Sequence, residues 1–185
     1  LGVDVTSFGR PSEEELAHDF LWRVHMATPK KGVIGVFNRS QYEDVLVVKV
    51  KGYASPEAIE QRYGQINDFE KLLAQNGTRV LKFMLHISPE EQAERLRDRM
   101  ADETKRWKFN PGDLDDRKLW DQYMAAYQAA LTRCSTDHAP WHVIPADRNW
   151  VRNAVIARIT RDTLEEMNPQ FPAPKDWDPK TITIT

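Results

Sequence analysis

The fold is decided by the stretch Gly32-Val33-Ile34-Gly35-Val36-Phe37, which is followed directly by Asn38-Arg39-Ser40. Its apolar residues run continuously rather than alternating with polar ones, which is typical of a strand covered on both faces. The residues 3–8, 80–87 and 141–145 form further β-rich runs. Strands of this kind separated by helical stretches predict an α/β fold with a parallel sheet, in which 32–37 is a central strand.

The helices between these strands are predicted from their start and stop signals. Ser12 with Glu15 three residues later forms a capping box, and Ser55-Pro56 and Ser88-Pro89 each combine a capping residue with a proline in the first turn. The predicted helices cover residues 12–28, 42–50, 55–77, 88–100, 115–133 and 149–167. Ligands of such sheets bind beyond the carboxyl ends of the strands, so the residues that follow each strand are the ones to inspect.

Composition limits the classes of function. The 185 residues suit one domain, and 26 Lys plus Arg against 28 Asp plus Glu give a net charge of −2. We therefore expect no nucleic-acid or membrane partner, and any anion site must be a local cluster. The single Cys134 and the lack of a long apolar run favour a cytoplasmic protein. None of the eight glycines precedes a lysine, so a phosphate loop of the G-x-x-x-x-G-K-[ST] type is missing from this sequence.

The first candidate site follows the strand 32–37. Asn38, Arg39, Glu43 and Asp44 place an amide, a guanidinium and two carboxylates at a strand end and in the first turn of a helix. Phosphoryl transfer needs a metal holder and a cation for the developing charge, and this segment supplies both. A purely structural alternative is a capping box formed by Ser40 and Glu43.

The second candidate site is a set of eight cations within 24 positions: Arg95, Arg97, Arg99, Lys105, Arg106, Lys108, Arg117 and Lys118. Nearby acidic residues nearly balance them, so a solvated, salt-bridged hairpin is one interpretation. Lys105, Arg106 and Lys108, however, surround Trp107 in a predicted loop, and cations on a loop suit a polyanion or a nucleotide phosphate. A third cluster, Arg23 with His18, Asp19 and His25, lies on the first helix, and such a helix is more often part of the core than catalytic.

Four stretches, in the same order and spacing, resemble the family-2 polyphosphate kinases. They are Pro11-Ser12-x-x-Glu15-Leu16-x-His18-Asp19-Phe20-Leu21-Trp22-Arg23, Phe37-Asn38-Arg39-Ser40-x-Tyr42-Glu43-Asp44-Val45-Leu46-Val47, Lys105-Arg106-Trp107-Lys108 and Ala139-Pro140-Trp141. The resemblance runs from residue 3 to about residue 166, which is nearly the whole chain.

The resemblance implies a P-loop kinase-like three-layer sandwich with a parallel sheet and a helical lid. The chain would be a single domain over 1–185, with the lid at about 95–120 and a C-terminal tail at 168–185. The family's Asp-x-x-Gly-Lys phosphate loop and the strand before it are missing from this sequence. That strand is normally central, so we expect exposed edges on its two neighbours, a domain incomplete at its N-terminus, and no activity from this chain alone.

The implied reaction moves the terminal phosphate between inorganic polyphosphate and a nucleotide, with Mg²⁺ as cofactor. Asn38, Arg39 and Glu43 would be catalytic, and Glu43 is a possible contact of a metal that is otherwise held through the phosphates. The substrate-binding residues would be Arg23, Asp19, Tyr42, Lys49, Lys105, Arg106, Lys108 and Arg117. The form Asn-Arg-Ser resembles the subgroup that accepts AMP as well as ADP, and the family suggests a homo-oligomer.

Two alternatives stay open at this point. One is an ATP-dependent nucleoside monophosphate kinase of the same fold. The other is a nucleotide- or polyphosphate-binding module without catalytic activity. The choice of phosphate donor separates the first alternative from the polyphosphate reading.

Overall fold

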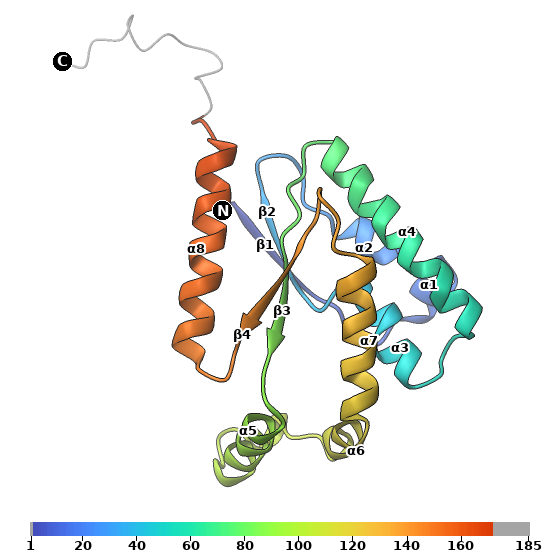
Figure 1. Ribbon diagram of the computed structural model, residues 1–185, viewed down its shortest axis with the longest axis vertical. Coiled ribbons are helices and arrows are strands. Elements are labelled where there is room, and N and C mark those ends of the chain that lie inside the picture. Colours follow the sequence, from blue (N-terminus) through green and yellow to red (C-terminus); the bar gives the residue numbers. More distant parts are fainter. Residues whose placement is uncertain (1, 172–185) are drawn as a thin grey trace, which may run out of the picture.

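The computed structural model describes residues 2–171 and shows helices packed around short parallel strands (Figure 1). The elements, in chain order, are β1 (Val3–Ser7), α1 (Glu13–Leu16), α2 (Trp22–Met26), β2 (Ile34–Asn38), the 3₁₀ helix η1 (Gln41–Val45), α3 (Val47–Val50), α4 (Pro56–Gln75), β3 (Lys82–His86), α5 (Pro89–Ala101), the 3₁₀ helix η2 (Arg106–Lys108), α6 (Gly112–Lys118), α7 (Trp120–Arg133), β4 (Trp141–Pro145) and α8 (Asn149–Met167). Most of the predicted C-terminal tail, residues 172–185, lies outside the described residues.

The strands pair in parallel, as the sequence predicts. β1 pairs with β2, with Val3 opposite Ile34 and Ser7 opposite Asn38, and β3 pairs with β4, with Lys82 opposite Trp141. The α/β class with parallel strands is therefore confirmed. Each pair brings two strand ends to one edge, and the backbone N–H of Phe8 continues the first ladder by donating to the carbonyl of Asn38 at 3.0 Å.

The two strand pairs are not joined into one sheet. Among residues 2–171, β2 bonds only to β1 and β3 only to β4, so each has a free edge, as the resemblance leads us to expect. The prediction that the strand 32–37 is covered on both faces is wrong for these residues, because Ile34 and Val36 are 42% and 45% exposed. No described element packs closely enough against these two side chains to bury them. Even the 19-residue helix α8 has no buried residue.

The main core lies between η1, α4 and α7 instead of over the strands. Its buried residues are Tyr42, Val45, Leu46, Ile59, Tyr63, Ile66, Ala126, Ala130 and Cys134. A smaller cluster joins Phe8, Val24 and Phe69. The core thus packs directly beneath the segment that follows β2, and it fixes the position of the first candidate site.

Three predicted helices are interrupted. The helix predicted over 12–28 is α1 and α2, because the Asp19 carboxylate accepts the backbone N–H of Leu21 at 2.9 Å and starts a new helix after a turn. The helix predicted over 42–50 is η1 followed by α3, with a non-helical backbone at Leu46. The helix predicted over 115–133 is α6 and α7, which meet at Leu119.

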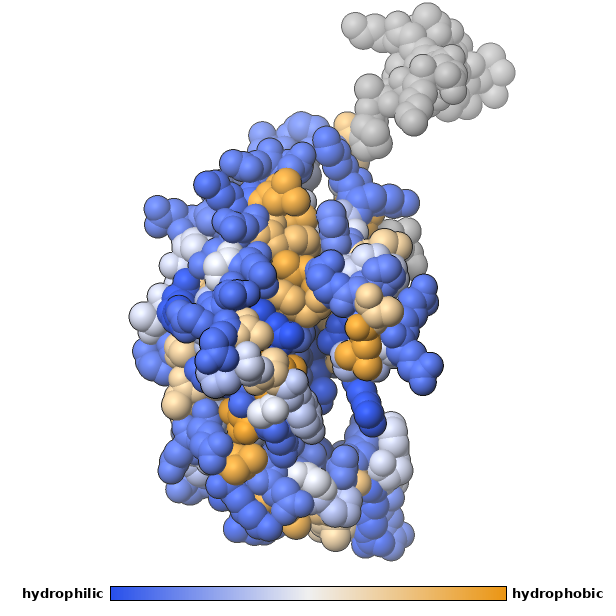
Figure 2. Space-filling view, turned by 90° about the vertical axis from the view of Figure 1, so that its right-hand side faces the viewer, coloured by the Kyte–Doolittle hydropathy of each residue, from blue (hydrophilic) through white to orange (hydrophobic). Residues whose placement is uncertain are grey.

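The surface carries apolar side chains in several places. On the face shown in Figure 2 they form patches among hydrophilic residues, the largest as a band in the upper half. Strand residues contribute to the exposed apolar surface of the molecule: Val3, Val5, Ile34, Val36, Leu85 and Val143. No helix among residues 2–171 is long and apolar enough to cross a membrane.

Candidate phosphate-transfer site

The backbone is unusual where β2 ends. Arg39 adopts a φ of +63°, a left-handed backbone conformation that residues with a Cβ rarely take. Ser40 then caps η1 by accepting the backbone N–H of Tyr42 at 3.4 Å. The capping box offered as a structural alternative for Ser40 and Glu43 is not formed, because the Ser40 hydroxyl bonds to Tyr42 instead of to the N–H of Glu43, and the Glu43 carboxylate lies 3.7 Å from the Arg39 guanidinium. Strain of this kind gathers at functional sites.

Burial shapes the electrostatics of the two acidic residues of η1. It is the largest effect on the pKa of Glu43 and of Asp44, and it raises both. Arg62 of α4 opposes this at Asp44, whose carboxylate it meets at 3.1 Å. Arg39 and Arg23 both lower the pKa of Glu43, so the two cations lie within electrostatic reach of this carboxylate.

Arg23 reaches the same region from α2. Its guanidinium donates to the carbonyl of Gly9 at 3.0 Å, lies 3.8 Å from the Glu15 carboxylate and sits over the ring of Phe8. It lines a hollow of about 290 Å³ at the carboxyl end of β1. The hollow is bounded by Thr6, Ser7, Phe8, Gly9, Arg10, Glu15, Arg23, Met26 and Ala27. Asp19 lies in the turn before α2, where its carboxylate accepts the backbone N–H of Leu21, as described above.

The structure therefore pairs Arg39 with Glu43 beyond the end of β2, and places Arg23 within electrostatic reach of the same carboxylate. Two guanidinium groups suit phosphate oxygens, and the Glu43 carboxylate with the Asn38 amide supplies hard oxygen ligands. Within residues 2–171 there is no group of three or more His, Cys, Asp or Glu side chains that could hold a metal alone. Mg²⁺ is commonly held by one or two carboxylates together with substrate phosphates, and the donors present fit that mode.

Two predicted substrate-binding residues point away from this group. Tyr42 is 2% exposed, and its hydroxyl is bonded to Glu70 and Lys82 in the interior. Lys49 of α3 donates to the hydroxyl of Tyr63 at 3.3 Å. Both side chains therefore contact the core in this arrangement.

The predicted lid residues lie on a separate part of the molecule, from α5 to α6. Lys105 pairs with Asp102 at 2.6 Å, and Arg106 bonds to the carbonyl of Met100 at 2.8 Å, yet both side chains remain more than half exposed. Lys108 lies over the exposed ring of Trp107. Arg117 instead ties α6 to α5, because it donates to the Pro89 carbonyl at 2.7 Å and to Gln92 at 2.8 Å.

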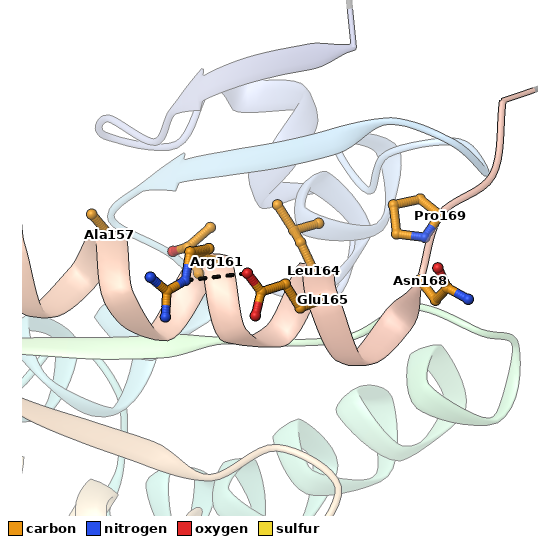
Figure 3. Close-up of a pocket in the computed structure, with 7 residues that line it drawn as sticks. Ala157, Arg161, Leu164, Glu165, Asn168 and Pro169 are labelled. Atoms are coloured by element: carbon orange, nitrogen blue, oxygen red, sulfur yellow. Dashed lines mark ion pairs between the residues drawn. The ribbon is translucent and has the colours of Figure 1, made fainter.

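A larger hollow, of about 740 Å³, runs along α8 (Figure 3). Its lining consists of Ala157, Thr160, Arg161, Leu164, Glu165, Asn168 and Pro169. Arg161 and Glu165 pair with each other across one helical turn at 3.4 Å. The hollow contains none of the predicted site residues, and it belongs to the incompletely covered side of α8.

Sequence reasoning missed four residues that surround the site. Tyr127 of α7 lies close enough to Glu43 and Arg39 for their charges to act on its pKa, which burial raises. Arg62 supports Asp44 from α4. Glu70 and Lys82 form a buried ion pair at 2.6 Å beneath η1. Only Tyr127 had a signal in the sequence, and its helical spacing with other apolar residues also fits a core position.

Comparison with known proteins decides between families that share this fold. The model of the family described as Polyphosphate kinase 2 matches residues 1–172. The chain belongs to the polyphosphate kinase 2 family. It is 51% identical to an AMP/ADP-polyphosphate phosphotransferase from Meiothermus ruber, over 98% of this chain and 68% of that protein. An ADP-polyphosphate phosphotransferase from Rhodopseudomonas palustris is 39% identical, over 92% of this chain and 63% of that protein.

Solved structures agree with the polyphosphate kinase 2 fold. The crystal structure of Polyphosphate Kinase 2 from Arthrobacter aurescens TC1 superposes with a TM-score of 0.92 at 45% identity, and covers 96% of this chain. This chain spans 62% of that structure's length. The likeness confirms the P-loop kinase-like α/β class, and the partial span means that the activity of a whole polyphosphate kinase 2 is a proposal for this chain.

Proposed function

We propose that this chain supplies the phosphate- and nucleotide-binding part of an enzyme that moves the terminal phosphate between polyphosphate and AMP or ADP. The observation that carries the proposal is Arg39, which is 61% exposed in its side chain, strained in its backbone and paired with Glu43 where β2 ends. The names of the Meiothermus and Rhodopseudomonas relatives support the substrate class.

The reaction asks little covalent chemistry of the protein. An oxygen of the acceptor's terminal phosphate attacks the terminal phosphorus of polyphosphate, so one P–O bond forms. The anhydride bond to the next phosphorus breaks, and its electron pair leaves with the oxygen of the shortened polyphosphate chain. Catalysis then consists of in-line positioning and charge neutralisation, for which Arg39 and Arg23 provide the cations.

Mg²⁺ fits the donors of this site. Asn38 and Glu43 would hold the ion together with phosphate oxygens, and bound Mg²⁺ would neutralise charge on those oxygens. The neutral Asn38 contributes an amide oxygen where a carboxylate would bind more strongly. Glu43, whose pKa is raised by burial but lowered by Arg39 and Arg23, is the charged candidate.

The segment from about 95 to 120 would act as a lid over the polyanion. Lys105, Arg106 and Lys108 remain accessible on it, and each cation can meet an equivalent phosphate of a linear chain. Arg117 would hold the lid helices together through its contacts with Pro89 and Gln92. We also propose that the enzyme forms a homo-oligomer, is cytoplasmic and has no nucleic-acid partner.

A donor assay tests the proposal. The longest protein that the reading frame encodes is incubated with AMP or ADP, Mg²⁺ and either polyphosphate or ATP, and the products are separated by chromatography. We expect new ADP or ATP from polyphosphate. Activity with ATP alone would identify a nucleoside monophosphate kinase, and binding without turnover would identify a non-catalytic module.

Arg39→Ala is the matching residue-level test. Loss of the cation that faces the transferred phosphate should lower kcat by about a hundredfold or more, because charge stabilisation is the main contribution to this chemistry. The far-ultraviolet circular dichroism should be unchanged. Turnover equal to that of the wild type would remove Arg39 from the site.

A further inference from the structure

A buried polar network lies directly beneath the strained strand end. Glu70 of α4 is fully buried, and its Oε2 accepts from the Lys82 ammonium at 2.6 Å. Its Oε1 accepts from the Gln41 amide at 3.0 Å and from the Tyr42 hydroxyl at 2.9 Å. Gln41 and Tyr42 are the first two residues of η1, so the network grips the chain immediately after Arg39 and Ser40.

The ammonium of Lys82 is equally well satisfied. Besides Glu70, its acceptors are the Tyr42 hydroxyl at 2.8 Å and the carbonyl of Cys134 at 2.6 Å. The three donors of an ammonium group therefore meet three acceptors. Cys134 ends α7, whose carbonyl end favours a cation. With the donors of Lys82 and both carboxylate oxygens of Glu70 engaged, these two groups have their partners within the protein.

Stability alone does not account for such a network. Replacing a buried ion pair with apolar residues of similar volume is often neutral or stabilising, whereas removal of one partner is strongly destabilising. Burial raises the pKa of Glu70 and lowers that of Lys82, and the attraction between the two groups opposes both effects. Hydrogen bonds, unlike apolar contacts, are directional, and three of those in the network hold a side-chain atom of Gln41 or Tyr42 in place.

We propose that Lys82, Glu70 and Tyr42 are positioning residues, whose network holds residues 39–43 so that Arg39 and Glu43 face the reacting phosphate. The inference rests on the proposed function for its kinetic consequence, but the positioning itself is a structural claim. The left-handed Arg39 persists only if its surroundings hold it, and the network, which holds Gln41 and Tyr42 two and three residues further along the chain, supplies that constraint. Tyr42 thus acts through its neighbours instead of by touching the substrate.

The first experiment needs no activity. Amide hydrogen exchange is measured for the peptide containing residues 39–43 in the wild type and in the double replacement Glu70→Leu with Lys82→Met. We expect exchange in this peptide to accelerate at least tenfold while the protection of α8 stays close to wild type. The melting temperature should fall, because the replacement leaves Tyr42 and Gln41 without their buried partners. Unchanged exchange at 39–43 would overturn the proposal.

The second experiment measures whether the network acts through Arg39. The double replacement should lower kcat on the order of a hundredfold, with little change in the KM for nucleotide, because misplacement of a catalytic group by about 1 Å costs that much. In an Arg39→Ala background the same replacement should cost little more, since the positioned cation is already gone. An equal loss in both backgrounds would mean general destabilisation and would overturn the proposal.

Two further variants keep the outcomes distinct. Tyr42→Phe removes one hydroxyl and leaves the ion pair; it should accelerate exchange at 39–43 even if the double replacement fails to fold. Lys71→Met removes an exposed cation from the residue next to Glu70 and should change neither exchange nor kcat. If the wild type transfers no phosphate, the proposed function fails, while the exchange experiment still decides the positioning claim.

Discussion

At the scale of single residues, Arg39 combines a charge with a costly backbone. A non-glycine residue in the left-handed region costs about 1 kcal/mol, and glycine does not carry this cost. Because Arg39 has a φ of +63°, its side chain and its backbone have two separate roles. The guanidinium serves phosphate, while the backbone conformation directs the chain from β2 into η1.

This separation gives a paired prediction. Arg39→Gly and Arg39→Ala both remove the cation and should lose activity alike. Arg39→Gly should be more stable than Arg39→Ala by about 1 kcal/mol, because only the glycine relieves the strain. Urea denaturation of the two variants measures the difference. Equal stabilities would show that residue 39 is not held at positive φ in solution.

Glu43 gives a pH-dependent prediction. Burial raises its pKa above the ordinary value of 4.5, so the folded protein binds this proton more tightly than the unfolded chain does. The stability that this carboxyl contributes is complete below pH 4.5 and is lost as the pH rises through the raised pKa. Residue 43 is always neutral in Glu43→Gln. The free energy of unfolding of this variant should therefore increase relative to that of the wild type as the pH rises.

A series of urea denaturations from about pH 4 to about pH 7 checks this expectation. Glu57 provides a control with the opposite sign, because hydrogen bonds from its own backbone and from Ser55 lower its pKa. The free energy of unfolding of the wild type should therefore increase relative to that of Glu57→Gln as the pH rises. A pH-independent difference at Glu43 would contradict its burial.

At the scale of elements, the lid cations carry the next prediction. Arg106→Ala should raise the apparent KM for polyphosphate several-fold at low salt, and the difference should shrink as the ionic strength increases. Arg158→Ala on α8, which removes another exposed cation, is the matched control. Kinetics in the longest encoded protein at two salt concentrations measure both. An unchanged KM at low salt would make the loop around Trp107 a solvated surface.

The elements also show what local sequence signals can reveal. The Ser-Pro starts predict α4 and α5 correctly, because capping and proline act within a single turn. The break between α1 and α2 depends on the Asp19 side chain, whose preference for turns competes with an otherwise helical pattern. The start of α7 at Leu119 is marked by neither glycine nor proline, so a single long helix was the natural prediction.

The residues of the candidate site likewise fall into those that local sequence signals reveal and those that they do not. Asn38, Arg39 and Glu43 could be predicted because the end of a parallel strand is a place defined by the chain itself. Glu70 and Lys82 could not, since an acidic residue in an amphipathic helix and a lysine in a strand read as surface positions. Their burial follows from a contact between α4 and β3 that no local pattern encodes.

At the scale of the whole molecule, the two separate strand pairs leave apolar surface uncovered. Six large apolar residues of the strands are exposed, among them Val5 at 70% and Val143 at 53%. We expect this 185-residue chain to bind a hydrophobic dye such as anilinonaphthalene sulfonate while folded. Val36→Thr together with Val143→Thr should weaken the fluorescence. A folded chain without dye binding would show that these strand residues are covered in solution.

The buried network has a consequence for the order in which the molecule assembles. Its members belong to η1, α4 and β3, and Lys82 also bonds to the end of α7, 52 positions along the chain. Such a junction joins segments that are distant along the chain, and we expect its bonds to stabilise the protein only after the entropy of loop closure has been overcome. It is therefore a late event, and weakening it should mainly speed unfolding instead of slowing folding. The hydrogen bonds that position Arg39 would thus also slow unfolding and lengthen the lifetime of the folded state.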